Sequence, residues 1–513
     1  MKHCIKTLTL ISIILSLFSC SVHKINPNPV IKLEVQPLDS IYIYYNEKSS
    51  LFRIGNEFIE RTIFLDKKAN RIYTTTFLNK STQHNYINSL GEEFSFRING
   101  TQISGITGNV IYKSHQIFSQ VDAKGLELSF DVKLENIGTF SIRLLYEVYD
   151  HIPVIRKWIE IENKTGSSIA VDSVLMESIR LLPGIDFDID IRDLSEYLRN
   201  KKFRGLSTVV FNTNLKEGFI IGNETPGILK YNDVYSKPGK IGIGMTQQGG
   251  QYVPQIQITP KEIFSSPGAF VFLFTGEPEQ SKDRFEEFMF DYLLVNQSQK
   301  NSIQFENINP DINEAILIEK VKQTKNSGID IFCISGNWTD RRGDWTYEKN
   351  PYIKNIAEYT HSLGMKFGLC IDLSVAETES IILDQHSQWT VKLKNGSDYE
   401  ISDNKTKLMC LGSEYALYMA YEIDAIVKEL NLDYIKLTGE ILPIADKGGC
   451  FAVNHLHKTS LESLWYIYDG LFAIMKYLHV HNPNLIIDID LDSYNPSGLI
   501  DYALLMNANI NWQ

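Results

Sequence analysis

Cysteine is scarce in this sequence, with six in 513 residues. Two lie within the first twenty residues, and the other four all lie in the second half: Cys333, Cys370, Cys410 and Cys450. No pair among these four has the short spacing typical of zinc-binding cysteines. We therefore expect no metal site and interpret the four as small buried hydrophobic side chains. A disulfide stays open, because sequence alone cannot pair them.

Positive charge is also in deficit. The chain has 50 Lys and Arg residues against 62 Asp and Glu residues, which gives a net charge of −12. Binding to phosphate backbones needs clustered Lys and Arg, so no nucleic-acid partner is expected. No Gly-x-Gly-x-x-Gly follows a predicted strand and no Walker loop occurs, so no cofactor is expected either.

Long apolar runs are missing, apart from one at the start of the chain. That run, Leu8 to Phe18, is shorter than the ~20 residues that a membrane-spanning helix needs. Lys2 and Lys6 precede it, and Ser19 and Cys20 follow it. A basic start, a short apolar run and small residues are typical of a secretory signal, so residues 1–20 are predicted to be a signal peptide.

The end of this signal resembles the lipobox of bacterial lipoproteins, with Leu17, Ser19 and Cys20 in the expected order. The resemblance implies that Cys20 is lipidated. It also implies an exported protein anchored to a membrane of the bacterial cell envelope, in the periplasm or at the outer membrane. Residues 21–40 are polar and contain several prolines, which favours a tether. Plain secretion without an anchor is the alternative.

The next segment, residues 41–283, has the pattern of β-structure. Apolar and polar residues alternate along Leu126–Leu134, which predicts a strand with one buried face and one solvent-exposed face. Residues 142–148 repeat this alternation, and turn pairs such as Asn99-Gly100 and Pro183-Gly184 separate the candidate strands. Many strands with such turns predict a large two-sheet β-sandwich.

A different pattern begins after a helical connector, which we place at residues 284–300. Short apolar strands alternate there with amphipathic helices, of which Ser413–Leu430 and Thr459–His479 are the clearest. The predicted strands are Ile303–Asn307, Ile329–Ser335, Lys366–Asp372, Tyr434–Leu437, Leu485–Asp490 and Ile510–Trp512. Strand–helix alternation predicts a parallel sheet, and six strands are fewer than the eight of a closed barrel. Residues 301–513 are therefore expected to form an incomplete (β/α)8 barrel.

Several short stretches carry a family resemblance. They are Pro153-Val-Ile-Arg156, Gly343-Asp-Trp345, Lys366-Phe-Gly-Leu-Cys-Ile371, His386-Ser-Gln-Trp389 and Asp433-Tyr-Ile-Lys436. In this order and spacing they resemble glycoside hydrolase family 36, the bacterial α-galactosidases of the melibiase superfamily. The resemblance implies a β-sandwich followed by a (β/α) barrel. It also implies a carbohydrate partner, namely a galactoside-type oligosaccharide or polysaccharide.

The resemblance fails at the expected catalytic residues. Retaining glycosidases need two carboxyl groups ~5 Å apart. In the family the nucleophile is the Asp of Lys-Trp-Asp, and Thr438 occupies that position here. The family's acid/base Asp follows the sixth strand, where this sequence has Asn511-Trp512-Gln513 and no carboxylate. The sequence therefore predicts an inactive or altered enzyme with no intact catalytic residue.

Other residues at the predicted strand ends suit a sugar site. Trp338 and Trp345 could stack on a pyranose ring, and Asp344, Asp372 and Lys436 could hydrogen-bond its hydroxyls. The alternative is that the Trp residues pack the top of the barrel and the charges pair with one another.

Two further carboxylates, Glu440 and Asp490, could substitute for the missing pair, and exposed loop charges are the alternative for both. His455-Leu-His457 has a spacing that suits a metal, but no third ligand is evident nearby, so we interpret both as loop histidines. The sequence leaves two functions open. One is a glycan-processing exported lipoprotein that resembles an α-galactosidase. The other is a non-catalytic carbohydrate-binding surface lipoprotein.

Overall fold

The computed structural model describes residues 40–120, 122–199, 201, 204–245, 253–294, 301–309, 312–401, 405–495 and 499–509. The predicted signal peptide and tether, the lipidation site Cys20 and the sixth strand Ile510–Trp512 lie outside these residues and stay predictions. Within them, no helix combines the length and the apolar character that crossing a bilayer requires.

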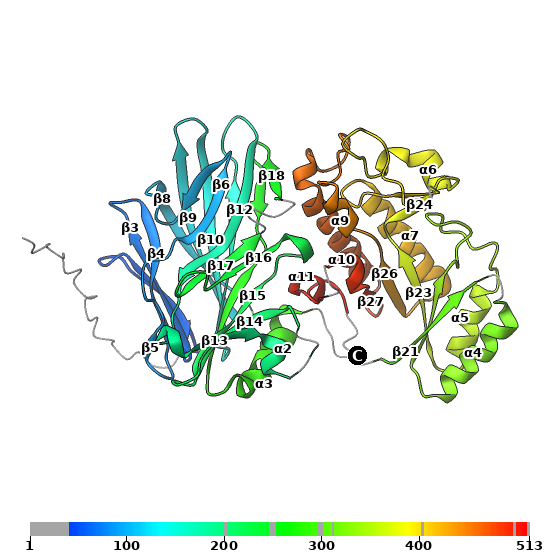
Figure 1. The fold of residues 1–513 in the computed structure, drawn as a ribbon, viewed down its shortest axis with the longest axis horizontal. Helices are drawn as coiled ribbons and strands as arrows, with labels where there is room; N and C mark the ends of the chain where they lie inside the picture. Colours follow the sequence, from blue (N-terminus) through cyan, green and yellow to red (C-terminus); the bar gives the residue numbers. More distant parts are fainter. Residues whose placement is uncertain are drawn as a thin grey trace, which may run out of the picture. The chain divides into compact units, whose positions relative to one another are not determined.

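The β-rich part contains three antiparallel sheets (Figure 1). One sheet has five strands in chain order: β1 (Ile41–Asn46), β2 (Leu51–Asn56), β3 (Ile59–Asp66), β4 (Arg71–Asn79) and β5 (His84–Asn85). A six-stranded sheet has the order β16 (Lys230–Val234), β17 (Lys240–Met245), β12 (Ile169–Arg180), β6 (Glu93–Ile98) and β7 (Thr101–Ser104), and β18 (Gln255–Ile258) also pairs with β12.

The third sheet is the largest, with nine strands. Its order is β13 (Ile189–Asp193), β14 (Ser207–Asn212), β15 (Glu217–Asn223), β20 (Ala269–Thr275), β11 (Val154–Glu162), β10 (Gly138–Tyr149), β9 (Ala123–Leu134) and β8 (Val110–Ser119). Strand β19 (Ile263–Ser265) pairs with β11 outside this order. Short helices interrupt the β-rich part: η1 (Asp186–Asp188), α2 (Leu194–Tyr197), η3 (Gly227–Leu229) and η4 (Pro278–Ser281).

Hydrophobic alternation explains the strands of the large sheet. Leu126, Leu128, Phe130 and Val132 on β9 are at most 1% exposed, and the alternating residues of β10 pack beside them in the same core. Both predicted strands are therefore confirmed. The prediction of two sheets is wrong, because β1 to β5 form a third. Alternation identifies the buried face of a strand but does not say which sheet the strand joins.

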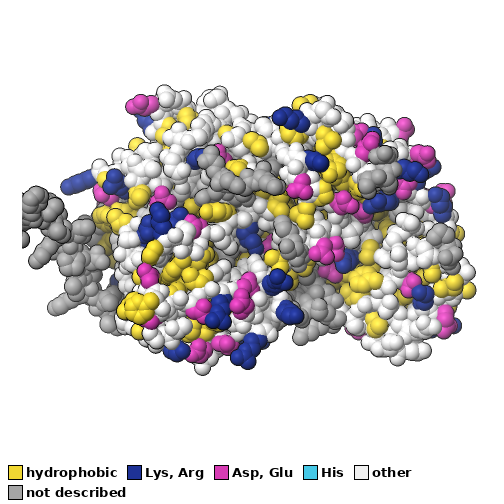
Figure 2. All heavy atoms as spheres, viewed as in Figure 1, with side chains coloured by type: hydrophobic (Ala, Val, Ile, Leu, Met, Phe, Trp, Pro, Cys, Tyr) yellow, Lys and Arg dark blue, Asp and Glu magenta, His cyan; other side chains and the backbone are white. Residues whose placement is uncertain are grey.

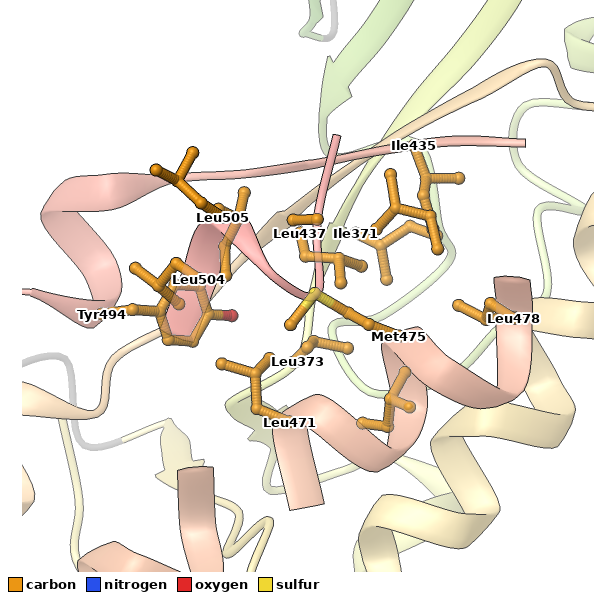
Figure 3. Close-up of a cluster of buried hydrophobic side chains, with 14 of the residues drawn as sticks. Ile371, Leu373, Ile435, Leu437, Leu471, Met475, Leu478, Tyr494, Leu504 and Leu505 are labelled. Carbon is orange, nitrogen blue, oxygen red and sulfur yellow. The ribbon is translucent and has the colours of Figure 1, made fainter. Parts of the chain in front are cut away.

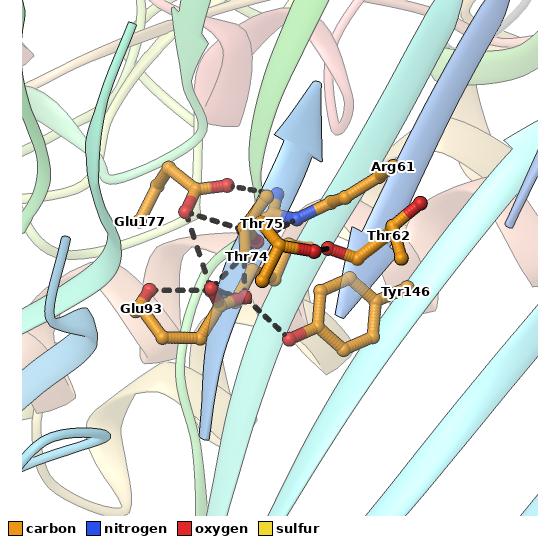
Figure 4. Close-up of polar contacts among 8 residues, drawn as sticks. Arg61, Thr62, Thr74, Thr75, Glu93, Tyr146 and Glu177 are labelled. Carbon is orange, nitrogen blue, oxygen red and sulfur yellow. Dashed lines mark hydrogen bonds and ion pairs between the residues drawn. The ribbon is translucent and has the colours of Figure 1, made fainter. Parts of the chain in front are cut away.

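A buried ionic network joins the three sheets (Figure 4). Arg61 on β3 contacts Glu177 on β12 and Glu93 on β6, each at 2.6 Å. Lys157 on β11 lies 3.1 Å from Glu93, and the Tyr146 hydroxyl on β10 donates to Glu93 at 2.7 Å. Two cations thus balance two carboxylates in a site without solvent, which is the arrangement that buried charges require.

Helices occupy the first part of the predicted connector. They are α3 (Lys282–Glu287) and a π-helical segment, η5 (Phe288–Leu293). Phe285 and Phe288 pack edge-on against Phe272 and Phe270 of β20, with ring centroids 5.3 and 4.9 Å apart. Residues 40–513 form one compact unit. On the face shown in Figure 2, Lys and Arg side chains are interspersed with Asp and Glu.

The second half contains five parallel strands in chain order: β21 (Ile303–Ile308), β22 (Ile331–Gly336), β23 (Lys366–Asp372), β26 (Tyr434–Thr438) and β27 (Ile486–Ile489). The long helices between them are α4 (Glu314–Asn326), α5 (Ile353–Ser362), α7 (Tyr415–Leu430) and α9 (Ser460–His481). The five strands, and the two helices α7 and α9, lie within two residues of their predicted bounds. Parallel neighbours in chain order, joined by helices, form part of a (β/α) barrel.

Smaller elements lie in the loops of this half. They are a two-stranded antiparallel sheet of β24 (Val375–Glu377) and β25 (Thr406–Leu408), and the short helices α6 (Ile381–His386), η6 (Ser387–Trp389), α8 (Leu442–Asp446), α10 (Leu491–Tyr494) and α11 (Tyr502–Leu505).

One face of the parallel sheet is covered by α9 (Figure 3). Ile371 of β23 and Leu437 of β26 point into this core, where they meet Leu471 and Met475 of α9, and all four are fully buried. Because side chains alternate along a strand, the neighbours of these residues point to the opposite face. That opposite face carries the polar residues at the strand ends.

Candidate functional site

Polar side chains meet at the carboxyl ends of three adjacent strands. The register pairs Asp372 of β23 with Thr438 of β26, and it pairs Leu437 with Ile489 of β27. Asp490, the residue after Ile489, therefore lies at the level of Thr438 on its other side. The structure thus brings together three residues that the sequence placed at strand ends. This is the end of a (β/α) barrel at which active sites are built.

Thr438, at the family's nucleophile position, is held by backbone contacts. Its hydroxyl donates to the Ile371 carbonyl at 3.4 Å. Its own carbonyl accepts from the Tyr494 hydroxyl at 2.7 Å and from the Leu373 N–H at 2.9 Å. Among the described residues, no side-chain base contacts this hydroxyl.

Lys436 and Asp490 pair with each other, at 3.4 Å between Nζ and Oδ1. Asp490 also accepts from the Ser493 hydroxyl at 2.6 Å, and the Lys436 ammonium lies 5.2 Å from the centre of the Phe305 ring. The pairing of charges with one another, our alternative interpretation, therefore holds for these two residues.

Asp372 is an anchored carboxylate. Its Oδ2 contacts Nη2 of Arg342 at 2.7 Å, and its Oδ1 accepts from the N–H and the hydroxyl of Ser374 at 3.0 and 3.1 Å. The side chain keeps 32% of its surface exposed. Asp372 can therefore still meet a ligand while its orientation is fixed.

Glu440 is the one acid of this group whose carboxylate accepts no hydrogen bond within the described chain. Its backbone N–H donates to the Ser374 hydroxyl at 2.8 Å, which places it beside Asp372. Burial raises the pKa of Glu440, the negative charge of Asp372 raises it further, and Arg342 offsets part of the rise. The side chain is half-buried, so the exposed-loop interpretation is wrong. A shift caused by burial together with a specific charge is typical of functional acids.

The predicted aromatic platform is only half present. Trp338 is 2% exposed, and its indole N–H donates to the Cys370 carbonyl at 2.7 Å. Trp338 packs the fold and cannot stack on a sugar, so that prediction is wrong. The centroid of the Trp345 ring lies 6.1 Å from that of Trp338. Trp345 is half-buried, and its indole nitrogen has no hydrogen-bond partner within the described residues. Because the residue is partly exposed, Trp345 stays a candidate for contact with the apolar face of a ligand.

Asp344 has a structural role instead of the predicted contact with a sugar hydroxyl. It is buried and accepts from the backbone N–H groups of Ile381 and Ile382, at 2.8 and 3.4 Å, where α6 begins. Burial raises the pKa of Asp344, and these N–H groups offset part of the rise. The preceding Gly343 has φ +95°, and a Cβ there would lie 2.7 Å from the Cβ of Ala376. The Gly-Asp-Trp motif is thus a tight turn that stabilises α6.

Sequence reasoning missed three residues of the site. Arg342 and Ser374 hold Asp372, and Tyr494, which is fully buried, fixes the end of β26. Arg342 directly precedes the Gly-Asp-Trp motif, and that position was a usable signal. Ser374 and Tyr494 stand in no recognisable pattern.

A second cluster lies in the loops before α7 and α9. Single ligand atoms of Cys410, Cys450, His455 and His457 all lie within 4.8 Å of one another. Further potential ligands therefore do lie near the histidines, contrary to our expectation, and Cys410 and Cys450 are buried as predicted. Loop packing brings together residues that are far apart in the chain, which no spacing rule could show.

A cavity of about 480 Å³ lies elsewhere in the described structure. Its lining includes Arg156 and Trp158 of β11 and Tyr468 of α9. Arg156 makes two parallel contacts with Glu224, at 2.6 and 2.7 Å. None of the predicted site residues lines it. We place the candidate site at the strand ends, because the strand register brings Asp372, Thr438 and Asp490 together there.

The chain has a β-rich domain followed by parallel β/α units with polar strand ends. This architecture places it in the class of proteins with an N-terminal β-domain and a (β/α) barrel. Residues 284–512, a little under half of the chain, match the family model described as Melibiase. The resemblance to family 36 α-galactosidases is thereby confirmed.

Known proteins agree with this assignment. Alpha-galactosidase 1 of Pediococcus pentosaceus is 26% identical over 137 residues, which is 25% of this chain but only 18% of that protein. The alpha-galactosidase from Lactobacillus brevis has a similar fold, with a TM-score of 0.68 at 15% identity, and the match covers 91% of this chain and 73% of that one. A family 36 α-galactosidase from Geobacillus stearothermophilus, solved with stachyose, has a TM-score of 0.64 at 14% identity over 86% of this chain and 72% of its own.

Proposed function

We propose that this chain is a glycan-processing protein of the α-galactosidase class. It binds a galactoside-type glycan at the strand ends and does not form a covalent glycosyl intermediate at residue 438. The observation that carries the proposal is Thr438 itself, whose hydroxyl donates to a backbone carbonyl at the position where the family has its nucleophile. The complex of the Geobacillus relative with stachyose supports the class of ligand.

The strand ends offer suitable groups for a sugar. Asp372 is fixed in orientation and partly exposed, so it can accept from sugar hydroxyls. Trp345 is partly exposed, so its ring can contact the apolar face of a pyranose.

Titration of the purified protein with stachyose, followed by calorimetry, tests the binding. Trp345→Ala should weaken binding about tenfold, which corresponds to roughly 1.4 kcal/mol of lost ring contact. Trp158→Ala is the matched control, because that tryptophan is also partly exposed but lines the distant cavity. Equal losses in both variants, or no binding of any galactoside by the parent protein, would contradict the proposal.

One observation favours a second candidate function, hydrolysis by relocated carboxylates. Glu440 is half-buried and unpaired, with a pKa raised by burial and by Asp372. In this candidate a protonated Glu440 donates its proton to the departing glycosidic oxygen, and Asp372 accepts a proton from the attacking water. Turnover of a chromogenic α-galactoside that Glu440→Gln abolishes and Thr438→Ala leaves intact would select this function over binding alone.

We also propose that the protein is exported and anchored through Cys20, on the strength of the signal-like start of the sequence. Labelling with a radioactive fatty acid in the producing cell tests this. Cys20→Ala should remove the label and release the protein from the membrane fraction, whereas Cys4→Ala should change neither. A label that survives Cys20→Ala would refute the anchor.

A further inference from the structure

The Cys/His cluster has contacts at the distances that a tetrahedral metal site requires. Sγ of Cys410 lies 3.6 Å from Nε2 of His457, and Sγ of Cys450 lies 3.7 Å from Nδ1 of His455. The two ring nitrogens are 3.2 Å apart. Zinc bound tetrahedrally, with Zn–S of about 2.3 Å and Zn–N of about 2.0 Å, separates sulfur from nitrogen by about 3.5 Å and nitrogen from nitrogen by about 3.3 Å.

The cluster is closed to solvent. Cys410, Cys450 and His457 are each 0% exposed, and His455 is the one member at the edge of the cluster. Two thiolates would balance the double charge of a divalent cation, so the occupied site would carry no net buried charge. Four protein ligands leave no open position, which is typical of a structural zinc site and not of a catalytic one.

Neighbouring groups orient these ligands. Nε2 of His455 contacts the Gln388 carbonyl at 2.8 Å. A carbonyl only accepts, so Nε2 carries the proton and the lone pair of Nδ1 points into the cluster. The Lys392 backbone N–H donates to Sγ of Cys450 at 3.5 Å, and the Cys450 N–H donates to the Ser463 hydroxyl at 2.9 Å. Such hydrogen bonds hold His455 and Cys450 in the orientation that metal binding needs.

A metal-free cluster satisfies these groups poorly. His457 can donate one proton from Nε2, either to Nδ1 of His455 or to Sγ of Cys410, but not to both. Its other nitrogen, Nδ1, is buried and has no partner within the described chain, so Nε2 provides the polar contacts of the ring. A single cation would be bound by both ring nitrogens and both sulfurs at once.

We propose that Cys410, Cys450, His455 and His457 form a structural Zn²⁺ site. The site joins the turn before α7 to the loop between α8 and α9, and it stabilises the packing of both helices. Two thiolates together with two imidazoles favour zinc among the common divalent cations.

The test is metal analysis of the full chain, purified without chelator and without added metal. We expect about one zinc per chain in the parent protein, and at least a tenfold lower content in Cys410→Ser and in Cys450→Ser. Cys370→Ser is the matched control. Its sulfur lies 3.8 Å from that of Cys333, a cysteine pair that belongs to no such metal-ligand group, so this variant should keep its zinc.

Two further measurements keep the test decisive if a serine variant does not fold. Exchange of Co²⁺ into the parent protein should give the visible absorption of tetrahedral thiolate-bound cobalt. Alkylation without reductant, followed by peptide mass analysis, should recover Cys410 and Cys450 as free thiols after the metal is released. A parent protein without metal, zinc retained in both cluster variants, or a Cys410–Cys450 disulfide would each overturn the proposal. None of these readouts depends on glycan binding.

Discussion

Replacement of Arg61 by Met should remove a large part of the stability of the β-rich domain. Arg61 is fully buried and contacts Glu93 and Glu177, which are 0% and 3% exposed. The variant leaves two buried carboxylates facing the single cation Lys157. Removal of one partner from a buried ion network costs about 3–5 kcal/mol. That is a large part of a domain stability of about 5–15 kcal/mol.

The loss should depend on pH. Burial of Glu93 acts to raise its pKa, but the charges of Arg61 and Lys157 outweigh burial and hold the pKa below its usual value. A lowered pKa in the folded state stabilises the fold above the unfolded-state pKa of about 4.3, and this stability is lost as the pH falls through the folded-state pKa. Without Arg61 one carboxylate takes up a proton more readily, so the deficit of Arg61→Met should be smaller at pH 5 than at pH 7.

Urea unfolding followed by circular dichroism measures both effects. Arg143→Met is the matched control, because its pair with Glu160 is partly exposed, at 34% and 21%, and such pairs contribute less than about 1 kcal/mol. The double variant Arg61→Met/Glu177→Gln restores one cation to one carboxylate and should recover part of the loss. An Arg61→Met protein within 1 kcal/mol of the parent, or one whose deficit grows as the pH falls, would refute the reasoning.

Three further predictions concern the second half of the chain. Thr438→Ala should leave hydrolysis of a chromogenic α-galactoside unchanged, and a parent turnover that this variant abolishes would contradict our account of Thr438. Asp344→Ala should cost about 1–2 kcal/mol in urea unfolding, because the first N–H groups of α6 lose their acceptor, and an unchanged midpoint would argue against that role. Removal of zinc from the Cys410 cluster by a chelator should lower the melting temperature, whereas the chelator should not affect Cys410→Ser; equal shifts in both proteins would exclude the metal as the cause.

Hydrophobic periodicity made the elements of this protein predictable. The stripe of Met419, Ile423, Ile426 and Leu430 defined α7, and all four residues are buried. The strands β23 and β26 likewise lie where apolar runs predicted them. A strand of a (β/α) barrel is buried on both faces, so its sequence is a short apolar run. Polar residues directly after those strands pointed to the correct end of the sheet.

The amino-acid sequence by itself thus determined the order of the elements and the β-domain followed by parallel β/α units. Only the tertiary structure decided what individual side chains do. It buried Trp338, used Asp344 to hold a helix end, left Glu440 unpaired, and brought Cys410 within reach of His457. The physical reason is that periodicity and turn chemistry act between near neighbours in the chain. The surroundings of a side chain are set by segments that meet only after the loops have packed.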